Sequence, residues 1–139
     1  MITGAGGQVG RFLTAETGRR GLDVLALTSA EWDITDADAA KRIVAPGDLV
    51  INCAAFTAVD AAESEPDRAH AVNAVGPGFI AQACAAAGAR MIHISTDYVF
   101  NGSFDGAGRP YEVDDATGPL RGYGKTKLAG DHAVPQAPT

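Results

Sequence analysis

Tyr123 and Lys127 lie four residues apart, a spacing that places two side chains on the same face of a helix. A tyrosine with its ordinary pKa of about 10 is a poor proton donor or acceptor at neutral pH. A fixed positive charge beside the phenol favours the phenolate and brings proton transfer within reach. The pair therefore predicts acid–base chemistry, with Tyr123 exchanging the proton and Lys127 lowering its pKa.

A glycine-rich turn near the start of the chain could hold a phosphate group. Gly4, Gly7 and Gly10 follow a short apolar segment and open a helical pattern. In dinucleotide-binding folds, such glycines allow a tight turn, backbone approach to the pyrophosphate and close helix–strand packing, with the anion at the helix N-terminus. The spacing is GxxGxxG instead of GxGxxG, because Val9 occupies the last glycine position of that pattern. We expect the cofactor to contact Gly4, Gly7, Gln8, Val9 and Gly10.

The choice between NADH and NADPH is open at this level. An acidic residue about 20 positions after the turn usually binds the ribose hydroxyl of NAD, whereas an arginine suits the 2′-phosphate of NADP. The second predicted strand ends at 27–29 in Leu-Thr-Ser, which provides neither. We count Asp33 and Ile34 among the expected cofactor contacts, although Asp33 could equally begin the turn into the next helix.

Short apolar runs alternate with helical patterns, which is typical of βαβ units and a parallel sheet. The predicted strands lie near Met1–Thr3, Asp23–Leu27, Asp48–Cys53 and Arg90–Ser95, with a further short one possible at Trp32–Ile34. The predicted helices lie near Gln8–Arg20, Asp36–Val44, Pro66–Ala87 and Leu120–Val134. The stretch Asn101–Gly118 is predicted to be a long surface loop. The fold class is therefore α/β, a Rossmann-like doubly wound parallel sheet, which we expect to be truncated at both ends because its central first strand is short.

The bulk composition is that of one globular domain. With 139 residues, 46% hydrophobic and 20% charged, the chain can bury a real core. A net charge of −6 without a Lys/Arg block argues against a nucleic-acid partner. No run reaches the roughly 18 apolar residues of a membrane span. Cys53 and Cys84 are the only cysteines and resemble small buried hydrophobes of a reducing compartment, so we expect a cytoplasmic protein.

Four segments of the chain are distinctive when taken together. They are Asn52–Asp60 (NCAAFTAVD), Ala62–Pro66 (AESEP), Ile94–Gly102 (ISTDYVFNG) and Tyr123–Gly130 (YGKTKLAG). This combination resembles the dTDP-4-dehydrorhamnose reductase family of extended short-chain dehydrogenases/reductases, over essentially the whole chain. The resemblance implies reduction of the 4-keto group of dTDP-4-dehydro-L-rhamnose to dTDP-L-rhamnose by NADPH or NADH, a step of dTDP-rhamnose biosynthesis.

The same resemblance assigns roles to individual residues. It implies a catalytic triad in which Thr96 would hydrogen-bond the substrate carbonyl oxygen, Tyr123 would protonate it and Lys127 would hold the nicotinamide ribose. Tyr123 and Lys127 would thus contact the cofactor as well. Thr96, together with Asp97 and Tyr98, would lie along the nucleotide-sugar substrate. Further cofactor contacts would come from Ala54, Ala55 and Thr57.

Positions at which this chain differs from the family pattern lead to further expectations. Some members bind magnesium through acidic residues at the dimer contact, and Phe12 occupies the first of these positions, so we predict no metal site. Residues 1–139 would form the NAD(P)-binding Rossmann domain that carries the triad, with the C-terminal substrate-binding lobe absent. A homodimer of the full-length protein is possible.

Two alternative functions stay open. Nucleotide-sugar epimerases keep the Tyr/Lys pair, although they lack the run Asp97–Phe100; dehydratases usually have a second carboxylate where Tyr98 stands. A non-catalytic NAD(P)-binding regulatory module is the third candidate, and the intact triad argues against it.

Several other polar residues are predicted to be structural. We expect His93 to be partly buried and Asn52 to serve packing. Glu63 and Glu65 are expected to form a solvated entrance to the following helix. Pro77 lacks the N–H group that would bond the carbonyl of the residue four positions earlier, which predicts a kink in the long helix.

Overall fold

A parallel sheet of four short strands lies at the centre of the computed structural model, which describes residues 1–103 and 108–135. The strands are β1 (Ile2–Thr3), β2 (Ala26–Leu27), β3 (Leu49–Asn52) and β4 (Arg90–His93). Their order in the sheet is β2-β1-β3-β4. The chain passes from β1 to β2 on one side of β1 and then crosses to β3 on its other side, so a crevice is expected at the carboxyl ends of β1 and β3.

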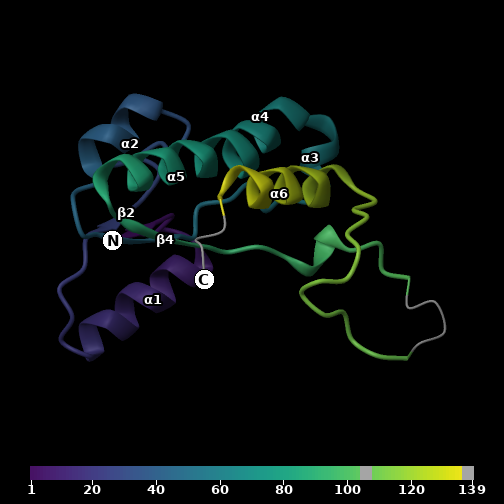
Figure 1. The fold of residues 1–139 in the computed structure, drawn as a ribbon, viewed down its shortest axis with the longest axis horizontal. Helices are drawn as coiled ribbons and strands as arrows, with labels where there is room; N and C mark the ends of the chain where they lie inside the picture. Colours follow the sequence, from purple (N-terminus) through teal and green to yellow (C-terminus); the bar gives the residue numbers. More distant parts are fainter. Residues whose placement is uncertain (104–107, 136–139) are drawn as a thin grey trace.

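The helices cover both faces of the sheet. They are α1 (Gln8–Arg19), α2 (Ala37–Ile43), α3 (Ala61–Ser64), α4 (Pro66–His70), α5 (Gly76–Ala87) and α6 (Gly122–Ala133), with a π-helical turn η1 (Ala71–Val75) and a 3₁₀ turn η2 (Asp97–Val99). Figure 1 shows α1 on one face and α2, α5 and α6 on the other. This arrangement confirms the predicted doubly wound α/β fold.

The main core lies between the sheet and the helices α2 and α5. It contains Trp32, Ile34, Val50 and Ile80, all nearly inaccessible to solvent. The strand considered at Trp32–Ile34 is wrong, because this segment forms a turn in which the Trp32 N–H donates to the Thr28 carbonyl at 2.9 Å. Its apolar residues reflect core filling and not strand pairing.

The long helix predicted at Pro66–Ala87 is interrupted as Pro77 required. The π-helical turn η1 separates α4 from α5 just before the proline. Such single turns accommodate a missing backbone hydrogen bond and often occur at functional sites. The Asn73 carbonyl in this turn lies against α6 at Gly130, so closely that a Cβ at Gly130 would overlap it. The π-helical turn therefore lets Gly130 of α6 pack closely against the Asn73 carbonyl.

Two further features bear on the site. The loop predicted at Asn101–Gly118 has no regular secondary structure in its described residues 101–103 and 108–118, and four of its residues lie outside the described part. On β4, which has a sheet neighbour on one side only within the described residues, Ile92 is 46% exposed, and Ile94 directly after the strand is 40% exposed. No helix among the described residues is long and apolar enough to cross a membrane.

Candidate active site

A cavity of about 370 Å³ opens at the carboxyl ends of β1 and β3. The glycine turn forms one wall, and the segments that follow β2 and β3 form the others. Six of the residues predicted to contact a cofactor line it: Gly4, Gly7, Asp33, Ile34, Ala54 and Ala55. The other six lie outside this lining: Gln8, Val9 and Gly10 are in the first turn of α1, Thr57 is in the loop after β3, and Tyr123 and Lys127 are on α6.

The glycine turn leaves room for an anion at the start of α1. Gly4 has a φ of +62° and its carbonyl accepts a hydrogen bond from the Gly7 N–H at 2.9 Å. Gly10 packs so closely on the Gly4 carbonyl that a Cβ there would overlap it. No side chain caps α1 and its first turn has no acidic residue. A Cβ at Gly6 would come within 3.6 Å of the Thr28 methyl group, filling space that the cavity keeps open. These features fit a dinucleotide pyrophosphate.

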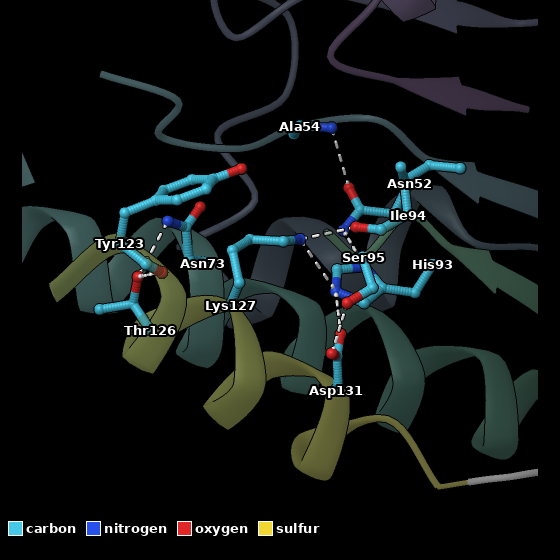
Figure 2. A network of polar contacts seen from close by, with 10 residues as sticks. All are labelled: Asn52, Ala54, Asn73, His93, Ile94, Ser95, Tyr123, Thr126, Lys127 and Asp131. Carbon is cyan, nitrogen blue, oxygen red and sulfur yellow. Dashed lines mark hydrogen bonds and ion pairs between the residues drawn. The ribbon is translucent and has the colours of Figure 1, made fainter. Parts of the chain in front are cut away.

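The three proposed catalytic side chains converge at the end of β4. Thr96 precedes η2, and its interaction with the Tyr123 phenol lowers the pKa of that phenol. Tyr98 packs edge-on against Tyr123, with ring centroids 5.6 Å apart. Figure 2 shows Tyr123 and Lys127 leaving the same side of α6 and extending towards the strand ends. The i, i+4 spacing thus has the geometric effect expected from the sequence.

The protonation of Tyr123 differs from the expectation. Burial raises the pKa of the Tyr123 phenol, the Thr96 hydrogen bond opposes this, and Tyr98 and Asp97 add to the rise. The expectation that Lys127 lowers this pKa is wrong in this structure. The reason is that the Lys127 ammonium donates instead to the Ile94 carbonyl at 2.6 Å. Tyr123 is therefore a neutral phenol at pH 7, the form that can donate a proton.

Lys127 is an unusually buried cation, with 2% of its surface exposed. Desolvation lowers the pKa of its ammonium, and the charge of Asp131, one helical turn later, opposes that shift. Its Nζ lies 3.4 Å from Nε2 of His93. Lys127 thus depends on the polar groups around it to remain charged.

His93 belongs to a network that begins inside the sheet. Oδ1 of Asn52 accepts hydrogen bonds from the Thr3 hydroxyl at 2.6 Å and the Ala54 N–H at 3.2 Å. The Asn52 NH₂ group therefore faces Nδ1 of His93 at 3.0 Å, which assigns the imidazole proton to Nε2. Burial, and then the Lys127 charge, lower the pKa of His93 to about 4. His93 is buried as expected, whereas Asn52 does more than pack.

The network ends at Asp131 on α6. Its Oδ1 lies 3.6 Å from Nε2 of His93, and its Oδ2 accepts a hydrogen bond from the Ser95 hydroxyl at 2.5 Å. Figure 2 shows the chain of contacts from Ala54 and Asn52 through His93 to Asp131. Neither Ser95 nor Asp131 was singled out from the sequence; the only signal was the four-residue spacing between Lys127 and Asp131.

Glu63 has a role in positioning α6 that the sequence did not reveal. Its Oε1 accepts a hydrogen bond at 2.9 Å from the N–H of Gly122, the first residue of α6. Arg121 at the N-cap position provides no side-chain hydrogen bond, so a residue 59 positions earlier supplies the cap. Glu63 is exposed and lies in the first turn of α3, as expected of a solvated helix entrance, and the cap on α6 is an additional role.

A second cavity, of about 310 Å³, adjoins the triad. Asp97 and Tyr98, both predicted to contact the substrate, line it together with Phe100, Tyr111 and Arg121. The Phe100 and Tyr111 rings stack with centroids 4.4 Å apart. The aromatic walls suit a ligand with a flat or sugar ring. Among the described residues, no group of three or more His, Cys, Asp or Glu side chains is placed to hold a metal ion.

Comparison with known proteins connects this geometry to a family. The family model described as the RmlD substrate binding domain matches residues 1–139. The dTDP-4-dehydrorhamnose reductase of Mycolicibacterium smegmatis is 65% identical over 134 residues, which cover 96% of this chain and 40% of that protein. The protein of the same name from Mycobacterium tuberculosis is 61% identical and 44% covered.

Solved structures agree. The dTDP-4-dehydrorhamnose reductase of Clostridium acetobutylicum superposes with a TM-score of 0.87 at 39% identity, over 96% of this chain and 47% of that one. The same enzyme from Bacillus anthracis, in complex with NADP, gives 0.85 at 37% identity, again over 96% of this chain and 47% of that one. The chain thus spans less than half the length of these relatives. Because the family model matches all of residues 1–139, this chain belongs to the RmlD substrate binding domain family.

Proposed function

We propose that the protein reduces the 4-keto group of dTDP-4-dehydro-L-rhamnose with NADPH or NADH, giving dTDP-L-rhamnose. The arrangement of Thr96, Tyr123 and Lys127 at the end of β4 carries this proposal. Contacts through His93 and Asn52 link Lys127 to Ala54, which lines the glycine-turn cavity. The names of the relatives that are 61% and 65% identical support the choice of substrate.

Each residue has a role that its environment permits. When bound, the reduced nicotinamide supplies the hydride that the carbonyl carbon receives. The Thr96 hydroxyl would donate a hydrogen bond to the carbonyl oxygen as negative charge grows there. Tyr123 would give its phenolic proton to the same oxygen, which completes the alcohol. Lys127 would hold the ribose hydroxyls, exchanging part of its present bond to the Ile94 carbonyl.

The cavities divide the remaining contacts between cofactor and substrate. Gly4, Gly7 and the start of α1, including Gln8, Val9 and Gly10, would surround the pyrophosphate. Asp33 and Ile34 would lie at the adenosine end, and Ala54, Ala55 and Thr57 nearer the nicotinamide. Asp97 and Tyr98 would bind the nucleotide-sugar. Residues 1–139 would thus be the cofactor domain with the triad, and a separate lobe would complete the substrate site.

Cofactor binding is tested first, on the chain itself. Trp32 is the only tryptophan, and it lines the glycine-turn cavity. Titration with NADPH and with NADH should change its fluorescence. Gly7→Asp, which adds a negative charge at the start of α1, should weaken both dinucleotides. A glycine-turn variant that binds them as well as the wild type would refute this placement.

Turnover is tested on the full-length protein with the keto-sugar nucleotide, by following NADPH absorbance. Tyr123→Phe should lower kcat by roughly 10²–10⁴-fold, the usual range for a lost general acid. Cofactor affinity should change little, because the ring and its packing are retained. Full activity of Tyr123→Phe would exclude the proposed proton transfer.

A further inference from the structure

We propose that Asp131 is a positioning residue for this reduction: it fastens the helix of Tyr123 and Lys127 to the end of β4 and places a negative charge beside Lys127. The inference rests on the proposed function for its catalytic consequence. Its structural content can be tested without turnover.

Asp131 links α6 to the end of β4 and the segment that follows it. The triad comes from two pieces of chain, because Thr96 follows β4 whereas Tyr123 and Lys127 belong to α6. The Asp131 carboxylate joins these pieces through the Ser95 hydroxyl at 2.5 Å and the His93 ring at 3.6 Å. Ser95 directly precedes Thr96. A shift of α6 along β4 would therefore change the distance between the Thr96 and Tyr123 hydroxyls.

The same carboxylate faces a buried cation through a neutral ring. His93 Nε2 lies 3.4 Å from Lys127 Nζ and 3.6 Å from Asp131 Oδ1. Because Asn52 fixes the imidazole proton on Nε2, the ring donates towards Asp131 and offers no lone pair to Lys127. The ammonium is held by one carbonyl, that of Ile94, and is nearly inaccessible to solvent. Asp131, whose side chain is 26% exposed, supplies the compensating charge.

The charged side chains of the other elements packed on α6 contact groups other than the Lys127 ammonium. Glu63 of α3 contacts Gly122, and Asp97 of η2 acts on Tyr123. The acidic, basic and histidine side chains of α4 are exposed, and α5 carries no Asp, Glu, His, Lys or Arg. From η1, Asn73 faces α6 with an amide that does not titrate. His93 and Tyr123 complete the titratable groups around Lys127 in the described residues.

The decisive experiment is a ¹³C NMR titration of the lysine side chains in Asp131→Asn and in the wild type. The chain has only three lysines, and Lys127→Arg assigns the signal of interest. The titration midpoint of Lys127 should move to lower pH in Asp131→Asn and return towards the wild-type value in Asp131→Glu. In Asp38→Asn, which removes an exposed carboxylate of α2, it should not move.

Kinetics of the full-length protein provide the second readout. Asp131→Asn should lower kcat by roughly 10–100-fold through misplacement of the triad, with a smaller effect on cofactor affinity. The alkaline limb of its pH–rate profile should shift to lower pH, which a purely structural role would not cause. An Asp131→Asn protein with the wild-type Lys127 midpoint overturns the proposal. The proposal is also overturned if the Lys127 midpoint in Asp131→Glu equals that in Asp131→Asn.

Two outcomes need a second variant or measurement: an Asp131→Asn protein that does not fold, and a wild type that is inactive. If Asp131→Asn does not fold, Ser95→Ala removes the 2.5 Å hydrogen bond and keeps the charge. Because the carboxylate is retained, the Lys127 midpoint should stay near the wild-type value while kcat falls, and a wild-type kcat in Ser95→Ala overturns the fastening role. If the wild type fails to reduce the keto-sugar, the proposed function is wrong, while the lysine titration still decides the role of Asp131.

Discussion

His93 shows how one buried side chain is fixed in a single protonation state. Its side chain is 6% exposed, and the Asn52 amide occupies its only acceptor nitrogen. Protonation would place a second positive charge beside Lys127 in a poorly solvated site. These contacts hold the pKa of His93 at about 4, below its ordinary value of 6.5. The ring is therefore neutral at physiological pH.

This state makes stability depend on pH. Since the folded pKa is lower than the unfolded one, the unfolded chain binds the proton more readily between these values. The contribution of His93 is fully present above about pH 6.5 and is lost as pH falls towards about 4. The full effect is at most roughly 3 kcal/mol, from the size of the pKa difference.

His93→Gln should therefore flatten the decline in unfolding free energy between pH 6.5 and 4, as measured by urea denaturation. Carboxylates contribute to the same decline, so the difference between variant and wild type is the relevant quantity. His70→Gln, at an exposed position of α4, should leave the decline unchanged. Parallel curves for His93→Gln and the wild type would contradict the prediction.

At the scale of elements, α6 is held mainly by groups from other parts of the chain. Glu63 caps its first turn, Asn73 donates to the Thr126 hydroxyl at 3.1 Å, and Asp131 reaches the end of β4. Its own sequence has weak helix signals, with glycines at positions 122, 124 and 130. The position of α6 therefore depends mainly on tertiary contacts and not on its own helix propensity.

Glu63→Ala should cost about 1 kcal/mol in unfolding free energy, the usual effect of a lost N-cap. Hydrogen exchange should accelerate at the first amides of α6, where the orphan N–H groups lie. Glu65→Ala is the matched control, because Glu65 makes only a surface ion pair with Arg68, which contributes less than about 1 kcal/mol. Equal effects of the two substitutions on α6 exchange would disprove the capping role.

The sequence predicted the elements better than the contacts between them. Strand and helix positions follow from local periodicity, and the glycine turn and the Tyr123/Lys127 spacing are local as well. The Trp32–Ile34 error arose because core filling and strand burial give the same apolar signal over three residues. Glu63 and Asp131 could not be found, because their partners lie 59 and 36 residues away and depend on how α6 docks.

At the scale of the whole molecule, the two cavities separate the tasks of the protein. The glycine-turn cavity is enclosed by β1, β2, β3 and the segments after them, all within this chain. The second cavity is formed by exposed loop residues around η2. The relatives are more than twice as long as the matched region, and the additional length would be expected to complete that side.

The isolated 139 residues should accordingly bind a dinucleotide and give negligible turnover of the keto-sugar nucleotide. Tryptophan fluorescence measures the first property and NADPH oxidation the second, on the same preparation. Robust steady-state turnover by this chain alone would show that the substrate site needs no further lobe.

The outer side of β4 has a consequence for handling the protein. Ile92 on β4 and Ile94 directly after it present aliphatic surface to water, and β4 has one free hydrogen-bonding edge in the described residues. Such an edge is a template for strand addition by a second molecule. Concentrated solutions of the isolated chain should thus scatter light increasingly with time, and a lysine in place of Ile92 should delay that aggregation.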